Sequence, residues 1–512
     1  MPAVEGQDID SEGSAPPTET PSTQGLDELA GKASTSAVWT VLGHGGAQFI
    51  RLASNLVVTR LLLTEYFGLM ALVNVFLIGL QLFSDIGIGP ALIQNKREDP
   101  DFVNTVWTMQ VFRGLALCLI AMPLAAPFAA FYDQPILASL IRVAALTAAI
   151  QGFNSASIFT QTRHLHLKRP IMVQFVAQLT GAVVMIIWAW FTRSIWSLVA
   201  AGIVAAIVTV VLSHVWLPGI RNRFRFDRHV ARSLFAFSSW IFLGTVAVFA
   251  ADQLDRIIFG KITTMTTLGV YSIAVMLAVA PTYALTRLAS TVLFPLYSRI
   301  SHSSADLSEV FLTARRPLLV LGGWATAGLV AGGPTIIRLL YDSRYWEAGW
   351  MLQILSAGLW FGMILGGTAG SVVLAVGRSD WLAATAFSKV LGMAAFVPLG
   401  YWLGGFPGAV AGLSTSELVR YAVAQFAAVK LGFDGRPQDL KFTVRIGIAA
   451  FVGWFGVHWL TELGITHVVF HAVVVFVLVT AFWARPLLVL LGRVRRKEGL
   501  FLRDSPLSHE NT

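Results

Sequence analysis

From Ala37 onward the sequence is a succession of apolar runs separated by short polar connections. A helix needs about 20 apolar residues to cross the hydrocarbon core of a membrane, and the runs have about that length. Only 13% of the 512 residues are charged, whereas soluble proteins carry about 25%. So few charges could not cover a soluble surface, and Cys118, the only cysteine, excludes a disulfide scaffold. The sequence therefore predicts an all-α integral membrane protein.

About 14 of these runs are long enough to be transmembrane helices. They cover residues 37–60, 66–92, 103–125, 136–158, 171–191, 194–217, 234–260, 268–295, 313–338, 349–376, 381–402, 407–429, 443–460 and 467–491. Residues 1–33 differ in kind, because they hold seven acids and a single base, Lys32. We expect them to form a disordered acidic tail in the cytoplasm.

Basic residues are distributed unequally between the two sets of connections. If residues 1–33 are cytoplasmic, nearly all Arg and Lys residues outside the runs fall on the cytoplasmic side. The opposite connections carry only Arg193, Lys261 and Arg344. The positive-inside rule therefore predicts that both termini are cytoplasmic. The net charge of +9 fits such loops better than it fits a nucleic-acid interface.

The connections on the outer side are short. They leave no room for the large outer loop that membrane glycosyltransferases and polysaccharide polymerases usually need. The sequence also has no Gly-x4-Gly-Lys-Ser/Thr phosphate loop, no His-Glu-x2-His and no nucleophile elbow. We therefore predict a protein that is not an enzyme and that uses no cofactor or metal.

Several residues recur 201 positions further along the chain. Trp39-x-x-Leu42-Gly43 matches Trp240-x-x-Leu243-Gly244, and at the same offset Gly68 falls on Gly269 and Arg60 on Lys261. This repeat predicts two six-helix lobes that enter the membrane from the same side, as in transporters built from parallel repeats. We expect an N-lobe at 34–217, a basic cytoplasmic linker at 218–233, a C-lobe at 234–430, two extra helices at 431–492 and a basic cytoplasmic tail at 493–512.

A few charged residues lie deep within the predicted helices. A charge there costs about 2.5–3.5 kcal/mol and so tends to face a cavity or a partner. Five bases suggest a binding site for an anionic substrate, because Arg binds phosphate through forked hydrogen bonds. They are Arg51, Arg113, Arg287, Lys389 and Arg420. The residues that we expect to act in gating or ion coupling are Asp85, Asp252, Asp255, Arg256 and Glu417.

The alternative is that these charges pair with one another inside the membrane. Glu417 and Arg420 are three residues apart and share a helix face. Asp255 and Arg256 adjoin in the sequence, and we expect them to point in different directions. Arg51 falls on Asp252 at the repeat offset, which suggests that these two side chains meet across the lobe interface or face one cavity.

Six short motifs occur in order between residues 35 and 430. They are Phe67-Gly68-Leu69, Asp85-Ile86-Gly87-Ile88-Gly89-Pro90-Ala91-Leu92-Ile93-Gln94, Phe131-Tyr132-Asp133-Gln134-Pro135, Leu254-Asp255-Arg256-Ile257-Ile258-Phe259-Gly260, Gly269-Val270-Tyr271-Ser272 and Phe294-Pro295-Leu296-Tyr297-Ser298-Arg299. Together they resemble the motifs of Wzx-type polysaccharide flippases in the MOP (multidrug/oligosaccharidyl-lipid/polysaccharide) superfamily. The two helices beyond the repeat resemble, in number, the extra pair of the related MurJ-type peptidoglycan-precursor flippases.

The resemblance implies transport rather than catalysis. Such flippases move undecaprenyl-diphosphate-linked oligosaccharide from the inner to the outer leaflet of the bacterial cytoplasmic membrane, and their lobes rock about a cationic cavity by alternating access. It implies lipid-linked oligosaccharide and membrane lipids as partners, together with polysaccharide polymerase or export machinery. Asp255 and Arg256 match the family's charged pair in the seventh helix.

Two other functions remain open. A multidrug/cation antiporter of the same superfamily is disfavoured by the deep bases, because cationic drugs prefer an acidic cavity. A non-catalytic membrane component of a polysaccharide synthesis complex would fit if the deep bases were dispensable. Because the phosphate loop is missing, we expect an ion or substrate gradient to drive transport, with Asp85 or Glu417 carrying the coupling ion.

Overall fold

The computed structural model describes residues 43, 45–84, 99–164, 166–228, 241–300 and 307–495. Within these ranges the chain is almost entirely helical and contains no β-strand, which confirms the all-α prediction. The predicted acidic tail, Asp85 with the motif that follows it, and the end of the predicted basic tail lie outside the described residues.

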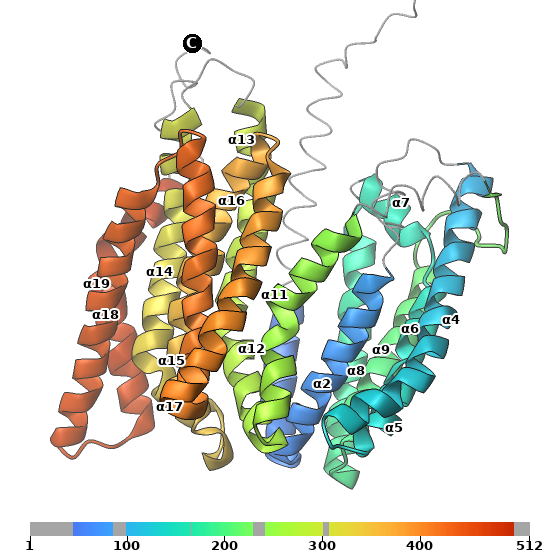
Figure 1. Cartoon of the computed structure of the whole chain (residues 1–512), viewed down its shortest axis with the longest axis horizontal. Coiled ribbons are helices and arrows are strands. Elements are labelled where there is room, and N and C mark those ends of the chain that lie inside the picture. Colours follow the sequence, from blue (N-terminus) through green and yellow to red (C-terminus); the bar gives the residue numbers. More distant parts are fainter. Residues whose placement is uncertain are drawn as a thin grey trace, which may run out of the picture.

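The N-terminal half forms one group of helices, coloured blue to green in Figure 1. It begins with a helix over residues 45–61. The helices that follow are α2 (Thr64–Phe83), α4 (Pro100–Phe131), α5 (Ile136–Ala144), α6 (Leu146–Gly152), α7 (Ser157–Arg163), α8 (Lys168–Thr192) and α9 (Trp196–Val215).

The C-terminal half forms a second group, which includes two π-helical turns, η1 and η3. Its elements are α11 (Ile241–Ile262), α12 (Met265–Leu288), η1 (Ala289–Leu293), α13 (Phe294–Ile300), α14 (Leu307–Leu340), η2 (Ser343–Tyr345), α15 (Ala348–Leu359), η3 (Trp360–Leu365), α16 (Gly366–Ala375), α17 (Ser379–Lys430), α18 (Arg436–Glu462) and α19 (Val468–Arg495). The last two helices pack on α14 and on each other.

Polar side chains mark the starts of two of the longer helices. The Asp99 carboxylate accepts a hydrogen bond from the Phe102 amide at 3.1 Å, where α4 begins. Thr264 Oγ1 accepts one from the Thr267 amide at 3.2 Å, where α12 begins. These bonds satisfy amide groups that the first turn of a helix leaves unpaired. The sequence thus fixes where α4 and α12 start.

The predicted number of fourteen transmembrane helices is not confirmed. Ten helices among the described residues are long and apolar enough to cross a membrane, and the bent pair Ile136–Gly152 and Ser157–Arg163 makes eleven. Part of the difference lies in α17, which covers two predicted runs and leaves helical geometry at Gly404 and Gly405. Another part lies in α11, which carries Asp252, Asp255, Arg256 and Lys261 within its 22 residues.

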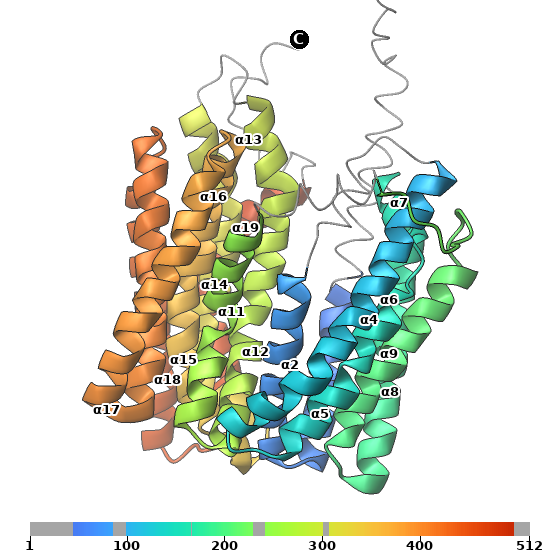
Figure 2. The same cartoon turned by 45° about the vertical axis from the view of Figure 1, so that its right-hand side comes forward.

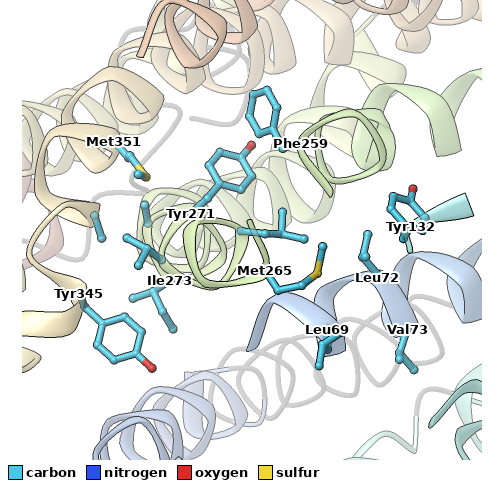
Figure 3. Close-up of a cluster of buried hydrophobic side chains, with 14 of the residues drawn as sticks. Leu69, Leu72, Val73, Tyr132, Phe259, Met265, Tyr271, Ile273, Tyr345 and Met351 are labelled. Carbon is cyan, nitrogen blue, oxygen red and sulfur yellow. The ribbon is translucent and has the colours of Figure 1, made fainter. Parts of the chain in front are cut away.

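The two groups of helices meet at one end of the molecule and diverge toward the other (Figures 1 and 2). We call the first the closed end; it contains the connections at 62–64, 131–136, 262–265 and 340–348. A buried core joins the groups there, with Leu69 and Leu72 of α2 near Met265 and Tyr271 of α12 (Figure 3). In a membrane, close packing rather than hydrophobic burial holds helices together, so these contacts set how the lobes fit.

Candidate functional site: the contact between the lobes

The helices α2 and α12 cross at a pair of glycines related by the repeat. A Cβ atom at Gly68 would clash with the carbonyl oxygen of Met265, and one at Gly269 would clash with that of Thr64. Thr64 and Met265 are themselves 201 residues apart. Only glycine allows two helix backbones to approach so closely. The crossing therefore lies where the two halves of the repeat are in equivalent contact.

A charged contact ties the start of the C-lobe to the N-lobe at the closed end. Lys261 Nζ donates to Asp133 Oδ2 at 2.8 Å and to the Phe131 carbonyl at 2.7 Å. Beside it, the Tyr132 hydroxyl donates to the Ile257 carbonyl at 3.2 Å. Phe131 ends α4 and Asp133 follows it, whereas Lys261 and Ile257 belong to α11. These bonds link the two lobes directly.

A second charged contact lies on the other side of the crossing. Arg344 Nη1 donates to the Leu62 carbonyl at 2.9 Å, and Nη2 donates to the Thr59 carbonyl at 2.7 Å. Asp342 holds the guanidinium in place through bonds of 3.0 Å and 2.6 Å. These hydrogen bonds from Arg344 lower the pKa of Asp342 below its ordinary value of 3.8. The Tyr341 hydroxyl also donates to Asn55 Oδ1 at 3.1 Å.

We call these two contacts, centred on Lys261 and Arg344, the latch. The sequence analysis assigned neither residue a function, although both are among the three bases of the outer connections. Basic residues are rare in outer connections under the positive-inside rule, so their presence there could have indicated a function. Nothing in the sequence indicated the partners of Arg344, since its guanidinium donates to backbone carbonyls of the other lobe.

Arg51 lines a wide-open cavity of about 330 Å³ on the N-lobe, together with Ser54, Gln174 and Gln178. The Arg51 side chain is exposed. Asp252 is not among the residues that line this cavity, and the expectation that Arg51 and Asp252 meet across the lobe interface or face one cavity stays a prediction. The Asp252 side chain is exposed on α11.

Arg113, another of the deep bases, hydrogen-bonds to the end of α2. Arg113 Nε donates to Ser84 Oγ at 3.1 Å and its Nη2 donates to the Gln81 carbonyl at 2.7 Å. Arg113 therefore caps the end of α2, where a cation also offsets the negative end of the helix dipole. The Arg287 side chain and Asp85 lie outside the described residues.

Asp255 and Arg256 lie closer than the sequence suggested. Arg256 Nη1 is 3.7 Å from Asp255 Oδ1, which corrects the expectation that the two side chains point apart. The Tyr271 hydroxyl donates to Asp255 Oδ2 at 2.6 Å, within the core that joins the lobes. Asp255 thus links α11 to α12, and the long flexible Arg side chain reaches back along its own helix.

The remaining pair of predicted residues is buried in the C-lobe. Lys389 Nζ lies 2.6 Å from Glu417 Oε1, and Arg420 Nη1 lies 3.7 Å from Glu417 Oε2. The predicted pairing of Glu417 with Arg420 is confirmed. Lys389 was expected to bind substrate, but its side chain is only 9% exposed and is occupied by this ion pair.

A further buried cluster was missed entirely. Arg315 of α14 lies 2.5 Å from Asp439 of α18, and both side chains are essentially inaccessible. Tyr421 and Gln425 also donate to Asp439. No sequence pattern indicated this cluster, because a base near a helix end is ordinarily assigned to a loop. The cluster fastens α18 to the C-lobe.

Two helical lobes that meet through polar contacts at one end and diverge toward the other are the architecture of a multi-pass membrane transporter. The chain belongs to the polysaccharide biosynthesis protein family, whose model matches residues 57–349. The resemblance to proteins of polysaccharide biosynthesis and transport is thereby confirmed.

Named relatives come from several bacteria. The chain is 24% identical to the succinoglycan biosynthesis transport protein ExoT of Rhizobium meliloti, over 63% of this chain and 65% of ExoT. It is 21% identical to the teichuronic acid biosynthesis protein TuaB of Bacillus subtilis, over 59% of this chain and 62% of TuaB. It is 21% identical to the lipopolysaccharide biosynthesis protein WzxC of Escherichia coli, over 77% of this chain and 80% of WzxC. The chain thus spans less than two thirds of ExoT and of TuaB.

Two solved structures share the fold. The inward closed conformation of the lipid II flippase MurJ matches with a TM-score of 0.66 and 15% identity, over 89% of this chain and 99% of that one. An inward-facing multidrug resistance transporter of the MATE family matches with a TM-score of 0.61 and 14% identity, over 77% and 95%. These similarities establish the fold, which is the one that the motifs implied.

Proposed function

We propose that the protein is a flippase that moves undecaprenyl-diphosphate-linked oligosaccharide from the cytoplasmic to the outer leaflet of the bacterial inner membrane. It acts by alternating access and performs no covalent chemistry. Both termini lie in the cytoplasm, so the closed end faces outward. Its partners are the lipid-linked oligosaccharide, the surrounding lipids and the polysaccharide polymerase or export machinery that receives the product.

The observation that carries this proposal is the way the lobes are joined. The lobes of an alternating-access transporter must separate at the closed end while the other end closes. The bonds of Lys261 and Arg344 are few, polar and partly exposed, so they can break and re-form at modest cost. Membership of the polysaccharide biosynthesis family supports a sugar-bearing cargo.

The diphosphate of the cargo requires cations in the transport path. Arg51 is the described base best placed for this, because it is exposed beside a cavity whose other polar residues are neutral. Its guanidinium can bind two phosphate oxygens at once. The amides of Gln174 and Gln178 can hydrogen-bond to phosphate or sugar hydroxyls. Arg287 is a second candidate on sequence grounds alone.

The test is the fate of the lipid-linked oligosaccharide in a deletion strain. We expect it to accumulate on the cytoplasmic leaflet, and the wild-type gene to restore export. Arg51→Ala should fail to restore export, whereas Arg51→Lys, which keeps the charge, should restore it in part. Arg142→Ala, which removes an exposed base on α5, is the control and should restore it fully. Normal distribution of the oligosaccharide in the deletion strain would contradict the proposal.

A further inference from the structure

The C-lobe contains an ion pair that the transport path does not explain. Lys389 lies in the first half of α17 and Glu417 in the second, on either side of the break at Gly404 and Gly405. The Glu417 side chain is only 5% exposed and the Lys389 side chain 9% exposed. Neither residue therefore contacts solvent or a cargo in this conformation.

The ion pair between Lys389 and Glu417 also lies against the π-helical turn η3. A Cβ atom at Gly362 would clash with Glu417 Oε2, so the carboxylate lies directly against the backbone of η3. One turn away, Ser414 lies against Gly358 in the same manner and donates to the Ile354 carbonyl. π-helical turns are rare and frequently occur at functional sites. Gly358 of α15 and Gly362 of η3 thus leave room for Ser414 and Glu417, respectively.

The Glu417 carboxylate has unused bonding capacity. Its Oε1 pairs with Lys389, but its Oε2 is buried and has no hydrogen-bond partner. Among the side chains that the structure describes, Arg420 Nη1, at 3.7 Å, is the other charged group near it, and η3 has no titratable side chain. A carboxylate at this depth needs a cation, and only one compact cation is in contact with it.

We propose that Glu417 is the carboxylate of a monovalent-cation site, and that the Lys389 ammonium permanently occupies the position of the cation. A buried carboxylate against irregular helix backbone, as at η3, is a typical place for a coupling cation in a transporter. Here the Lys389 side chain supplies an ammonium group with the same charge as a sodium ion. Removing the ammonium should therefore create a site for free sodium.

The consequence for transport rests on the proposed function. If the cation is tethered, sodium cannot drive the flippase through this site. Export should then be unaffected when potassium or choline replaces sodium in the medium. The binding claim itself needs no transport, so it can be tested separately on the full-length protein.

The experiment measures the thermal unfolding midpoint of the full-length protein in detergent, in sodium chloride and in choline chloride at equal ionic strength. The wild type should give the same midpoint in both salts. Lys389→Ala should unfold at a lower temperature in choline and recover most of that loss in sodium. Lys389→Gln, which keeps a polar side chain, repeats the comparison.

Two controls isolate the site. Lys389→Ala/Glu417→Gln should show no sodium response, because the carboxylate is gone. Arg420→Ala should show none either, because Lys389 still occupies the site. A sodium-specific rise in the wild type would overturn the proposal, since the site would then accept a free ion. So would the absence of sodium recovery in both Lys389 variants, including their failure to fold in sodium.

Discussion

Gly68 and Gly269 lie against each other where the two lobes cross, and each faces the residue four positions before the other. Because the glycines hold the same position in the two halves of the repeat, the crossing is symmetric to a first approximation. The two arms of the latch flank it, and in both a base of the C-lobe donates to groups of the N-lobe. The crossing and the latch together define the closed end.

Side chains at the crossing should destabilise the contact between the lobes. Gly68→Ala and Gly269→Ala each place a Cβ against a backbone carbonyl, and overpacking of this kind costs about 1–3 kcal/mol. We expect similar losses in the unfolding midpoint and similar losses of export for the two variants. Gly370→Ala is the matched control, because a Cβ there meets nothing within 4 Å. Tolerance of alanine at Gly68 or Gly269 would argue against the close crossing.

Breaking the first arm of the latch should favour opening of the closed end. Lys261→Asp replaces attraction to Asp133 by repulsion, and an exposed pair of this kind contributes about 0.2–1 kcal/mol. Labelling of a cysteine at Tyr132 should become faster in this variant. Adding Asp133→Lys should restore the wild-type labelling rate. If the charge swap leaves labelling fast, the Lys261 contact is not part of the closure.

The second arm should respond to acid. The pKa of Asp342 is lower in the folded protein than in the unfolded chain, because Arg344 donates hydrogen bonds to its carboxylate. The carboxylate therefore stabilises the folded protein above its ordinary pKa near 3.8, and this contribution is lost as the pH falls through the lowered value. We expect the unfolding midpoint of the wild type to fall more steeply between neutral and strongly acidic pH than that of Asp342→Asn. Parallel curves for the two proteins would contradict this.

The buried pair between Arg315 and Asp439 should matter for stability. Arg315→Met leaves Asp439 as an uncompensated buried charge, which costs about 3–5 kcal/mol. Arg315→Met/Asp439→Leu should recover much of this, because neither charge then remains. Arg316→Met, at the exposed neighbouring position, is the control and should change little. The measurement is thermal unfolding in detergent, and equal stability of the single and double variants would refute the pairing.

The sequence predicted the helical fold, and its repeat offset drew attention to one contact of the interface. Apolar run length is a local property, and the offset of 201 residues placed Gly68 and Gly269 in register. That the two glycines touch depends on how the helices are rotated against each other, which a repeat does not state. The pairing of Glu417 with Arg420 was predictable for the same local reason, since one helical turn joins them.

Contacts between distant helices were not predictable. Lys389 and Glu417 are 28 residues apart, and their meeting depends on how α17 folds back at Gly404 and Gly405. Arg315 and Asp439 are 124 residues apart on helices whose order of packing no sequence pattern revealed. The same holds for the deep charges in general, because depth in a helix says nothing about the neighbour that faces it.

The most direct measurement locks the closed end and follows export. In a chain whose native Cys118 is replaced by Ser, Asp133→Cys and Lys261→Cys would be joined by a short, reducible cross-linker. The account predicts that export stops, that lipid-linked oligosaccharide accumulates in the cytoplasmic leaflet, and that reduction restores export. Asp434→Cys/Arg436→Cys, a pair within one turn at the opposite end, is the control and should not block export. Export that continues while the lobes are cross-linked at Asp133 and Lys261 would contradict alternating access through the closed end.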